Sequence, residues 1–321
     1  MRILIEFKRV TKEYENGPAL AAIDLRVASR ELFVLVGPSG SGKTTLLKTV
    51  NRLVVPTSGQ VLIDGVDVAA GNLQELRQHI GYVLQSSALF PNMTVLQNAS
   101  VQLEALSWSK AKIRPRIERL LQMVDLDPTI YANRKPAELS GGEAQRVGIV
   151  RALAADPKLM LMDEPFSALD PVSKRQLQQL ILKLHRELET TIIFVTHDMH
   201  EAMLLADHVA VIHGGHLQQV GRPQEIINAP ANEFVANFFK DIIEDHQTLR
   251  QVVKAGFGQA AGPSPSPTLV ALPPETTIYQ WAALIQNQPL LQVKVDQTTL
   301  AATDLVSYLA SLEKEAVTNV Q

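Results

Sequence analysis

The 321-residue sequence contains no cysteine, which excludes disulfide bridges and metal sites built on thiolates, and which fits a reducing compartment. No apolar run approaches the roughly 18 residues that span a bilayer, so we expect any membrane role to be exercised through a partner. Neither sign of charge dominates: the formal net charge of −3 gives no whole-chain reason to expect a nucleic-acid partner. The remaining composition, 46% apolar and 20% charged, is that of an ordinary globular protein.

The most informative stretch is residues 37–45, the phosphate loop, which read Gly-Pro-Ser-Gly-Ser-Gly-Lys-Thr-Thr. They fit the phosphate-binding pattern G-x-x-x-x-G-K-[ST], with an apolar strand-like run before them and a helix-forming run after them. Backbone N–H groups of such a loop surround phosphate oxygens, and the helix dipole adds to their attraction. An ordinary glycine-rich turn is the alternative. We expect nucleotide to be bound by the whole loop, namely Gly37, Pro38, Ser39, Gly40, Ser41, Gly42, Lys43, Thr44 and Thr45.

Two residues of this loop have specific expected roles. Lys43 would neutralise the β- and γ-phosphates, and the hydroxyl group of Thr44 would hold Mg²⁺. A second Mg²⁺ ligand is predicted at Asp163, because it ends the apolar run 159–162 as a strand of a nucleotide hydrolase does. Glu164 comes next, where its carboxylate would polarise the attacking water. The alternative for both acids is a helix cap or a solvated turn.

A second anion-binding position is predicted at Ser140, Gly141 and Gly142, because a serine and two glycines precede a helix expected from about Ala144 to Ala155. A capping box, with Ser140 as N-cap and Glu143 three residues later, explains the same residues. The two interpretations are compatible, since one serine can cap a helix in one state and meet phosphate in another.

Strand-like and helix-like segments alternate through most of the chain, which predicts an α/β fold with a parallel sheet. Residues 93–135 lack a strong strand and read as a helical insertion. Composition changes near residue 240, so we expect one domain over 1–240 with a helical subdomain at about 93–150, a linker over 241–267, and a small strand–helix–strand–helix module over 268–321. The linker contains the Pro/Ser-rich stretch Ala260–Pro267.

With these residues in view, the chain resembles the ATP-binding subunit of an ABC transporter over about residues 1–240. The family's signature Leu-Ser-Gly-Gly-Gln corresponds to residues 139–143, the signature segment, where Glu143 replaces the glutamine. Further matches are an adenine-stacking aromatic, a glutamine-loop residue, a dimer-contacting loop ending in an aspartate, and a switch histidine: Tyr14, Gln85, Asp170 and His197. Taken singly, Tyr14 reads equally as a surface aromatic, Gln85 as a strand-end glutamine and His197 as the neighbour of a helix cap.

The resemblance implies a P-loop ABC ATPase domain with an antiparallel β subdomain and a helical subdomain. It further implies a homodimer that binds ATP and Mg²⁺ head to tail, with Glu164, His197 and Gln85 as catalytic residues and with Thr44, Gln85 and Asp163 around the metal. In this family the dimer docks on two integral-membrane permease subunits at the cytoplasmic face of the membrane, a substrate-binding protein acts indirectly, and no nucleic acid is involved. The expected reaction is ATP hydrolysis coupled to import.

The segments around residues 51–59, 81–95 and 136–157 are most similar to those of bacterial importers of glycine betaine, carnitine, choline and related osmoprotectants. Importers of amino acids, methionine or polyamines are the alternatives, followed by exporter ATPases and by ABC ATPases that act outside transport. The final segment, 268–321, resembles a single degenerate CBS module without the usual Thr-x-x-Asp spacing. We therefore expect pairing of copies by this module at least as readily as ligand sensing.

Overall fold

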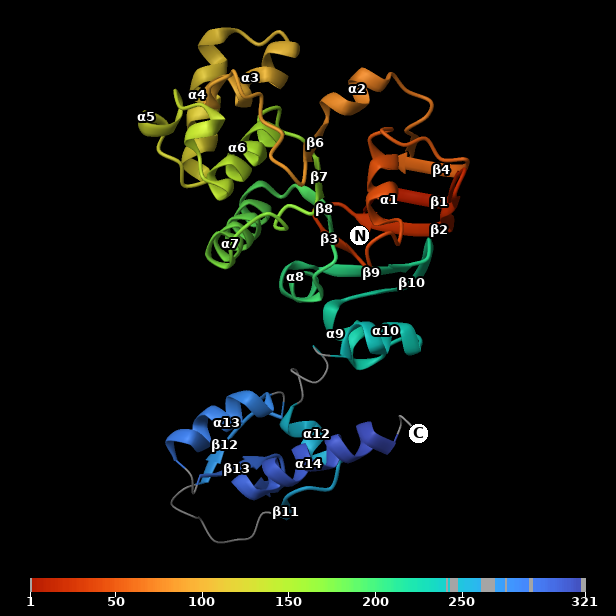
Figure 1. Ribbon diagram of the computed structural model, residues 1–321, viewed down its shortest axis with the longest axis vertical. Helices are drawn as coiled ribbons and strands as arrows, with labels where there is room; N and C mark the ends of the chain where they lie inside the picture. The colour runs from red at the N-terminus through yellow and green to blue at the C-terminus, as the bar shows by residue number, and fades with distance from the viewer. Residues whose placement is uncertain are drawn as a thin grey trace. The chain divides into compact units, whose positions relative to one another are not determined.

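The chain divides into two compact units, Met1–Phe238 and Phe239–Gln321, and each has its own sheet and its own core (Figure 1). The computed structural model describes residues 2–240, 242, 248–260, 269–274, 276–288 and 291–318. Most of the predicted Pro/Ser stretch, residues 261–267, lies outside these ranges. Within them, no helix is both long enough and apolar enough to cross a membrane.

A six-stranded sheet forms the centre of the first unit, in the order β10-β9-β3-β8-β7-β6. Its strands are parallel except β10, which pairs antiparallel with β9. The predicted parallel α/β sheet is therefore confirmed. The strands are β3 (Leu32–Val36), β6 (Ile80–Val83), β7 (Leu159–Asp163), β8 (Thr191–Thr196), β9 (His208–His213) and β10 (His216–Gly221).

Every residue of β3, β7 and β8 is buried, because elements cover both faces of the sheet. Figure 1 shows α1 (Lys43–Val50) on one face and α7 (Pro171–Leu188) on the other. Alternate residues of the strands, such as Leu35, Leu161 and Val195, join the core cluster that contains α1. Two-sided burial explains why these strands read in the sequence as continuous apolar runs.

A second, antiparallel sheet covers the outer side of α1, in the order β2-β1-β4-β5. At its edge, Asp64 and Gly65 connect β4 to β5 with φ angles of 49° and 78°, the left-handed pair that a tight hairpin turn needs. The strands are β1 (Ile3–Tyr14), β2 (Gly17–Ala28), β4 (Ser58–Ile63) and β5 (Val66–Asp67).

The predicted helical insertion is present between the strands β6 and β7 of the central sheet. Its two longer helices bury one side each, for example Ile117 and Leu121 of α4, and leave charged residues outside. They are α3 (Val95–Ala105), α4 (Lys110–Met123) and α5 (Pro128–Tyr131); the short α2 (Leu73–Gln78) precedes β6.

The helix that follows the signature begins earlier than expected. We expected it to start at about Ala144, but α6 spans Gly141–Leu153. The reason is a complete capping box: Glu143 N donates to Ser140 Oγ, and Ser140 N donates to the Glu143 carboxylate. The cap starts the helix at the two glycines in spite of their poor helix propensity. The first unit is completed by α8 (Met199–Leu205), α9 (Pro223–Asn228) and α10 (Glu233–Phe238).

The second unit packs helices on a small sheet of order β11-β14-β13-β12. Its buried core contains Trp281 and Leu300, and also Leu249 and Val252 of a helix inside the range expected as linker. That stretch resembles a linker because its apolar residues are few, but they join a core formed with residues between Ile278 and Tyr308. The elements are α12 (Leu249–Lys254), β11 (Gln259–Ala260), β12 (Leu269–Ala271), α13 (Ile278–Asn287), β13 (Gln292–Val295), β14 (Thr298–Leu300) and α14 (Ala302–Thr318).

Because the two tryptophans lie in different units, the separate cores make a testable prediction. In a Trp108→Phe background, fluorescence reports the buried Trp281 alone. Leu300→Ala should lower the unfolding free energy seen by Trp281 by about 2–5 kcal/mol in urea. The matched change Leu121→Ala, in the core of the first unit, should leave that transition in place. Equal shifts in the two variants would contradict two separate cores.

Candidate functional site

The candidate site lies along one edge of the central sheet, where four neighbouring parallel strands end. In spatial order, β6 leads to Gln85, β7 to Asp163 and Glu164, β8 to His197, and β3 to the phosphate loop. Loops at the carboxyl ends of parallel strands face the same side, so residues far apart in sequence meet there. The positions of these residues in the sheet bring the predicted catalytic groups to one edge.

The phosphate loop needs glycine at two positions for a steric reason. A Cβ atom at Gly37 would lie 2.0 Å from the Ile212 carbonyl oxygen, and one at Gly42 would lie 2.3 Å from the Ala19 carbonyl oxygen. Gly42 also has a φ angle of 102°, which L side chains rarely adopt, and it is the N-cap of α1. The loop is therefore held close to β9 and β2, with the N-terminus of α1 behind it.

Lys43 lies beneath the phosphate loop rather than in solvent. Its Nζ donates to the carbonyl oxygens of Gly37 and Pro38, both at 2.8 Å, and only 4% of the residue is exposed. Burial lowers the pKa of the Lys43 ammonium below its usual value, and the charges of Glu164 and Asp163 oppose that shift in part. The amine is thus held at the loop, within the electrostatic influence of the two predicted acids.

Asp163 meets the predicted metal-binding hydroxyl of the phosphate loop. Thr44 Oγ1 donates to Asp163 Oδ1 at 2.6 Å, and Lys48 Nζ lies 3.6 Å from Asp163 Oδ2. The Tyr82 hydroxyl also lies 3.5 Å from Oδ2, and burial, followed by the charge of Asp163, raises the pKa of Tyr82 so that it remains a donor. A hydroxyl and a carboxylate side by side fit Mg²⁺, which takes oxygen ligands and uses few from the protein when phosphates supply the others.

Glu164 and His197 are brought together from β7 and β8. His197 Nδ1 lies 3.2 Å from Glu164 Oε2, with about half of the histidine side chain exposed. The backbone of Glu164 is in the left-handed region at φ 45°, and its N–H donates to the carbonyl oxygen of Val195 at the end of β8. A non-glycine residue in that region stores strain, and here the strain turns the carboxylate from the strand toward the histidine.

The signature segment presents a capped helix end to solvent. Ser140 is exposed, while Glu143 is turned back: its two carboxylate oxygens accept from Tyr131 Oη at 2.6 Å and Ser140 N at 2.7 Å. The hydrogen bond from Tyr131, then that from Ser140 N, lowers the pKa of Glu143 below its usual value. The negative charge at this position, where the family has glutamine, is therefore directed at the start of its own helix and at the Tyr131 hydroxyl.

The phosphate loop and the signature segment do not meet within one chain. In the described part of the structure, no hydrogen bond or ion pair joins residues 37–45 to residues 139–143. Figure 1 shows the helices that follow them, α1 and α6, on different sides of the central sheet. The two predicted anion-binding positions are therefore separate within one chain.

Three predicted residues lie at the surface near these groups. Gln85 and Tyr14 are exposed, and the ammonium of Lys12 lies 5.0 Å above the Tyr14 ring. Asp170 is the N-cap of α7, where its Oδ1 accepts from Val172 N and Ser173 N. The side-chain hydrogen bond from Ser173 is the main cause of a lowered pKa at Asp170.

Two residues that support the glutamine loop were missed by the sequence reasoning. Gln145 Nε2 donates to the Leu84 carbonyl oxygen at 3.1 Å, and the Arg151 guanidinium donates to the carbonyl oxygens of Ser87 and Ala88 at 2.8 Å. Both lie on α6, so the signature helix holds the chain on either side of Gln85. No pattern in the sequence marks them, because six positions along a helix place the two side chains about 120° apart rather than on one face.

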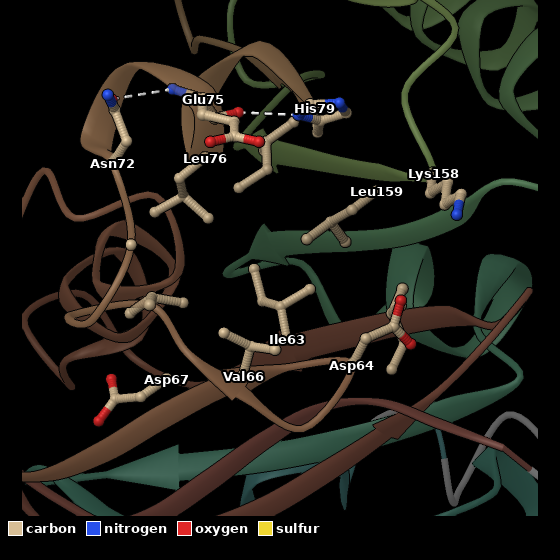
Figure 2. A pocket seen from close by; sticks show the side chains of 14 residues that line it. Ile63, Asp64, Val66, Asp67, Asn72, Glu75, Leu76, His79, Lys158 and Leu159 are labelled. Atoms are coloured by element: carbon tan, nitrogen blue, oxygen red, sulfur yellow. Dashed lines mark hydrogen bonds between the residues drawn. The ribbon is translucent and has the colours of Figure 1, made fainter.

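A cavity of about 520 Å³ lies away from this site, between the β4–β5 hairpin, α2 and β7. Figure 2 shows the side chains of Ile63, Val66, Leu76 and Leu159 converging in it. Leu159 is the first residue of β7, whereas Asp163 is the last. The cavity is therefore at the opposite edge of the sheet from the candidate site and does not contribute to it.

Comparison with known proteins agrees with this geometry. Residues 20–167 match the family described as ABC transporter. The glycine betaine/carnitine/choline transport ATP-binding protein OpuCA of Bacillus subtilis is 48% identical over 236 residues, which cover 73% of this chain and 62% of that protein. The sulfate/thiosulfate import ATP-binding protein CysA of Bradyrhizobium diazoefficiens is 42% identical over 244 residues, covering 75% of this chain and 70% of that protein.

A solved structure shares the fold. The dimeric structure of a post-hydrolysis state of the ATP-binding cassette MJ0796, bound to ADP and Pi, matches with a TM-score of 0.62 and 34% identity, over 68% of this chain and 99% of that one. The expected P-loop ABC fold of the first unit is thus confirmed. Since this chain spans only 62% of the length of OpuCA, likeness to OpuCA concerns part of that protein. By its motifs in order, its fold and these relatives, the chain belongs to the ATP-binding proteins of the ABC transporter family.

Proposed function

We propose that the chain hydrolyses ATP as one of two copies arranged head to tail, with each nucleotide enclosed by the phosphate loop of one copy and the signature segment of the other. One observation carries this proposal: the two segments predicted to bind anions, residues 37–45 and 139–143, are joined by no hydrogen bond or ion pair of the described residues. A phosphate loop covers one side of a triphosphate. A second copy, placed head to tail, would supply the other side from its signature segment.

The phosphate loop and Lys43 bind the triphosphate in this proposal. The N-terminus of α1 and the inward N–H groups attract the phosphate oxygens, and Lys43 exchanges its carbonyl partners for the β- and γ-phosphates. Tyr14, exposed at the end of β1, stacks on the adenine. A buried lysine with a lowered pKa keeps its proton in the presence of ATP, because the phosphate charge favours the ammonium form.

Mg²⁺ would be held by Thr44 and Asp163, with Gln85 from the neighbouring strand end as a further oxygen ligand. When bound, the ion neutralises charge that develops on the phosphate oxygens. Asp163 already accepts hydrogen bonds from Thr44 and Tyr82, and these bonds fix the direction of its carboxylate. The chain therefore provides oriented oxygen ligands at the end of the phosphate loop.

Glu164 orients the attacking water and His197 contacts the γ-phosphate. The carboxylate of Glu164 lies beside His197 Nδ1, which leaves Nε2 of the ring directed to the other side. General-base assistance of this kind contributes about 10²- to 10⁴-fold to rate. Ser140 and Gly142 of the second copy complete the γ-phosphate site by donating from the capped end of α6. Loss of the γ-phosphate then releases the two copies.

We further propose that hydrolysis drives import of a quaternary ammonium osmoprotectant, such as glycine betaine, carnitine or choline, through two permease subunits at the cytoplasmic face of the membrane. The 48% identity with OpuCA supports this solute class. The 42% identity with a sulfate/thiosulfate import protein shows why the class is a proposal, because cassettes named for other solutes share nearly as many residues. A substrate-binding protein would deliver the solute, and no contact with it is assigned to this chain.

The second unit is proposed to be a single CBS-like module. Its order of elements from β12 to α14, with two helices against a small mixed sheet, supports this interpretation. The apolar residues Val270, Leu284, Val306 and Leu309 are all at least 41% exposed. A set of exposed apolar side chains on so small a unit favours pairing with another copy over ligand sensing.

The head-to-tail arrangement predicts the behaviour of a Glu164→Gln variant. Without the carboxylate, ATP binding should persist while hydrolysis falls about 100-fold or more, so that a closed dimer accumulates. Size-exclusion chromatography with light scattering should then show two chains per particle only when ATP is present. Adding Lys43→Ala should abolish this dimer, whereas Lys110→Ala on the surface of α4 should not. Normal hydrolysis by Glu164→Gln would remove Glu164 from the reaction.

The proposed solute class is tested in the complex with its permease. We expect the reconstituted ATPase to be stimulated several-fold by glycine betaine or choline together with the binding protein encoded beside the permease. Sulfate, methionine and spermidine serve as comparison solutes. Stimulation by one of these, with no response to quaternary amines, would contradict the osmoprotectant assignment. The proposal that the chain hydrolyses ATP would remain.

A further inference from the structure

The first turn of α7 lies between the two nucleotide-contacting regions of one chain. Lys174, in this turn, has its Nζ 2.6 Å from Asp198 Oδ2 and 2.7 Å from Glu201 Oε1. Asp198 directly follows His197, and Glu201 is in α8. Lys174 therefore joins α7, through two ion pairs, to the loop that contains His197.

The two carboxylates in turn fix the backbone around His197. Asp198 Oδ1 accepts from His200 N and Glu201 N, so it caps α8, and Asp198 N donates to Thr196 Oγ1. The Thr196 hydroxyl donates to the second oxygen of Glu201. Residues 196 to 201 thus form one hydrogen-bonded turn around Asp198 and Glu201, and His197 projects from it toward Glu164.

The charge balance of this turn depends on Lys174. The Glu201 side chain is only 5% exposed, and in the described part of the chain Lys174 is the only cation paired with Asp198 or Glu201. Burial raises the pKa of Asp198, but the hydrogen bond and charge of Lys174 outweigh it, so that the pKa lies below its usual value. A buried carboxylate without its cation would be strongly unfavourable, so the turn and α7 are held together.

On its other side, α7 contacts the signature helix. A Cβ atom at Gly142 would lie 3.2 Å from the Ser173 side chain, and one at Gly141 would lie 3.8 Å from Leu169. One turn further on, Arg146 of α6 donates to Gln176 Oε1 at 3.1 Å. The first two turns of α7 are therefore packed against the signature segment and α6 on one side, and joined to the His197 turn by ion pairs on the other.

We propose that the first turn of α7 couples the two ATP sites of the dimer, with Lys174 as the positioning residue that transmits the state of the signature segment to His197. The inference rests on the proposed head-to-tail dimer, in which residues 139–143 contact the nucleotide of the second copy while His197 contacts that of its own. Closure on one nucleotide then moves α7 and, through Lys174, sets His197 at the other. Coupling of this kind is reciprocal and commonly amounts to about 5- to 150-fold.

The test replaces Lys174 with Met, which keeps the aliphatic length and removes the charge. In the wild-type chain, steady-state hydrolysis should depend cooperatively on ATP concentration, with a Hill coefficient above 1. Lys174→Met should reduce the coefficient to 1 and reduce kcat about tenfold, within the range of such coupling. The Kd of the isolated chain for ATP should change less than twofold, because Lys43 and the phosphate loop are untouched.

Two controls separate positioning from folding. Lys174→Arg keeps a cation within reach of both carboxylates and should restore most of the cooperativity. Lys174→Met combined with Glu201→Gln removes the unpaired buried charge; it should recover thermal stability but not the Hill coefficient. Recovery of cooperativity together with stability would overturn the inference, as would an unchanged Hill coefficient in Lys174→Met.

Failure of this inference is distinguishable from failure of the proposed function. If the wild-type chain hydrolyses ATP cooperatively and Lys174→Met does the same, only the coupling role of Lys174 is lost. If the wild-type chain neither hydrolyses ATP nor dimerises with it, the proposed function itself is wrong. If Lys174→Arg behaves as Lys174→Met, the charge is not the coupling element and the inference is also overturned.

Discussion

The parallel pairing of β3, β8, β7 and β6 is the constraint on which the rest of the structure depends. It sends four loops from four distant parts of the sequence to one edge of a sheet, so that the phosphate loop, His197, Glu164, Asp163 and Gln85 follow adjacent strands. Both faces of β3, β7 and β8 are buried, which requires mostly apolar residues along them. The predicted functional side chains lie only at the carboxyl ends of these strands and in the loops that follow.

The edge is shaped by backbone that departs from regular structure. Gly37 and Gly42 allow the phosphate loop to approach neighbouring carbonyl groups closer than any side chain permits. Glu164 takes a left-handed conformation without being glycine, held by its N–H bond to the carbonyl oxygen of Val195. Such a strained backbone persists because the hydrogen bonds and packing of the flanking sheet hold the residue in place. The result is a carboxylate beside His197 in the free chain.

The distribution of functional groups also explains why two copies are proposed. The signature segment and the phosphate loop are each well formed, yet lie in separate places, and α7 runs between the former and the His197 turn. In the proposed dimer, a chain built in this way would supply one half of a site at each of two positions. ATP that bridges two chains would then be sensed in both through packed helices rather than through flexible loops.

Much of this was predictable from the sequence. The phosphate loop, the strand before Asp163 and the turn at Asp64–Gly65 follow local rules: glycine where φ is positive, apolar runs for buried strands. The start of α6 was misplaced because a capping box overrides the low helix propensity of Gly141.

What the sequence did not reveal are pairs joined only by the fold. Gln145 supports the glutamine loop from 61 positions away, and Lys174 meets Asp198 from 24 positions away. Nothing local distinguishes these residues from ordinary polar positions of a helix. The helix at Leu249–Lys254 was missed for the same reason, since its apolar residues become buried only through the fold, in the core that contains Trp281.

The absence of cysteine makes the central claim directly measurable by cross-linking. One preparation carries Ser39→Cys in the exposed phosphate loop and Glu164→Gln; a second carries Ser140→Cys in the exposed signature segment and Glu164→Gln. Mixed with ATP and a short bifunctional maleimide, they should give a cross-linked pair of chains joining positions 39 and 140, which is absent without ATP. No such pair, together with an internal cross-link in a single chain carrying both cysteine substitutions, would contradict nucleotide held between two copies.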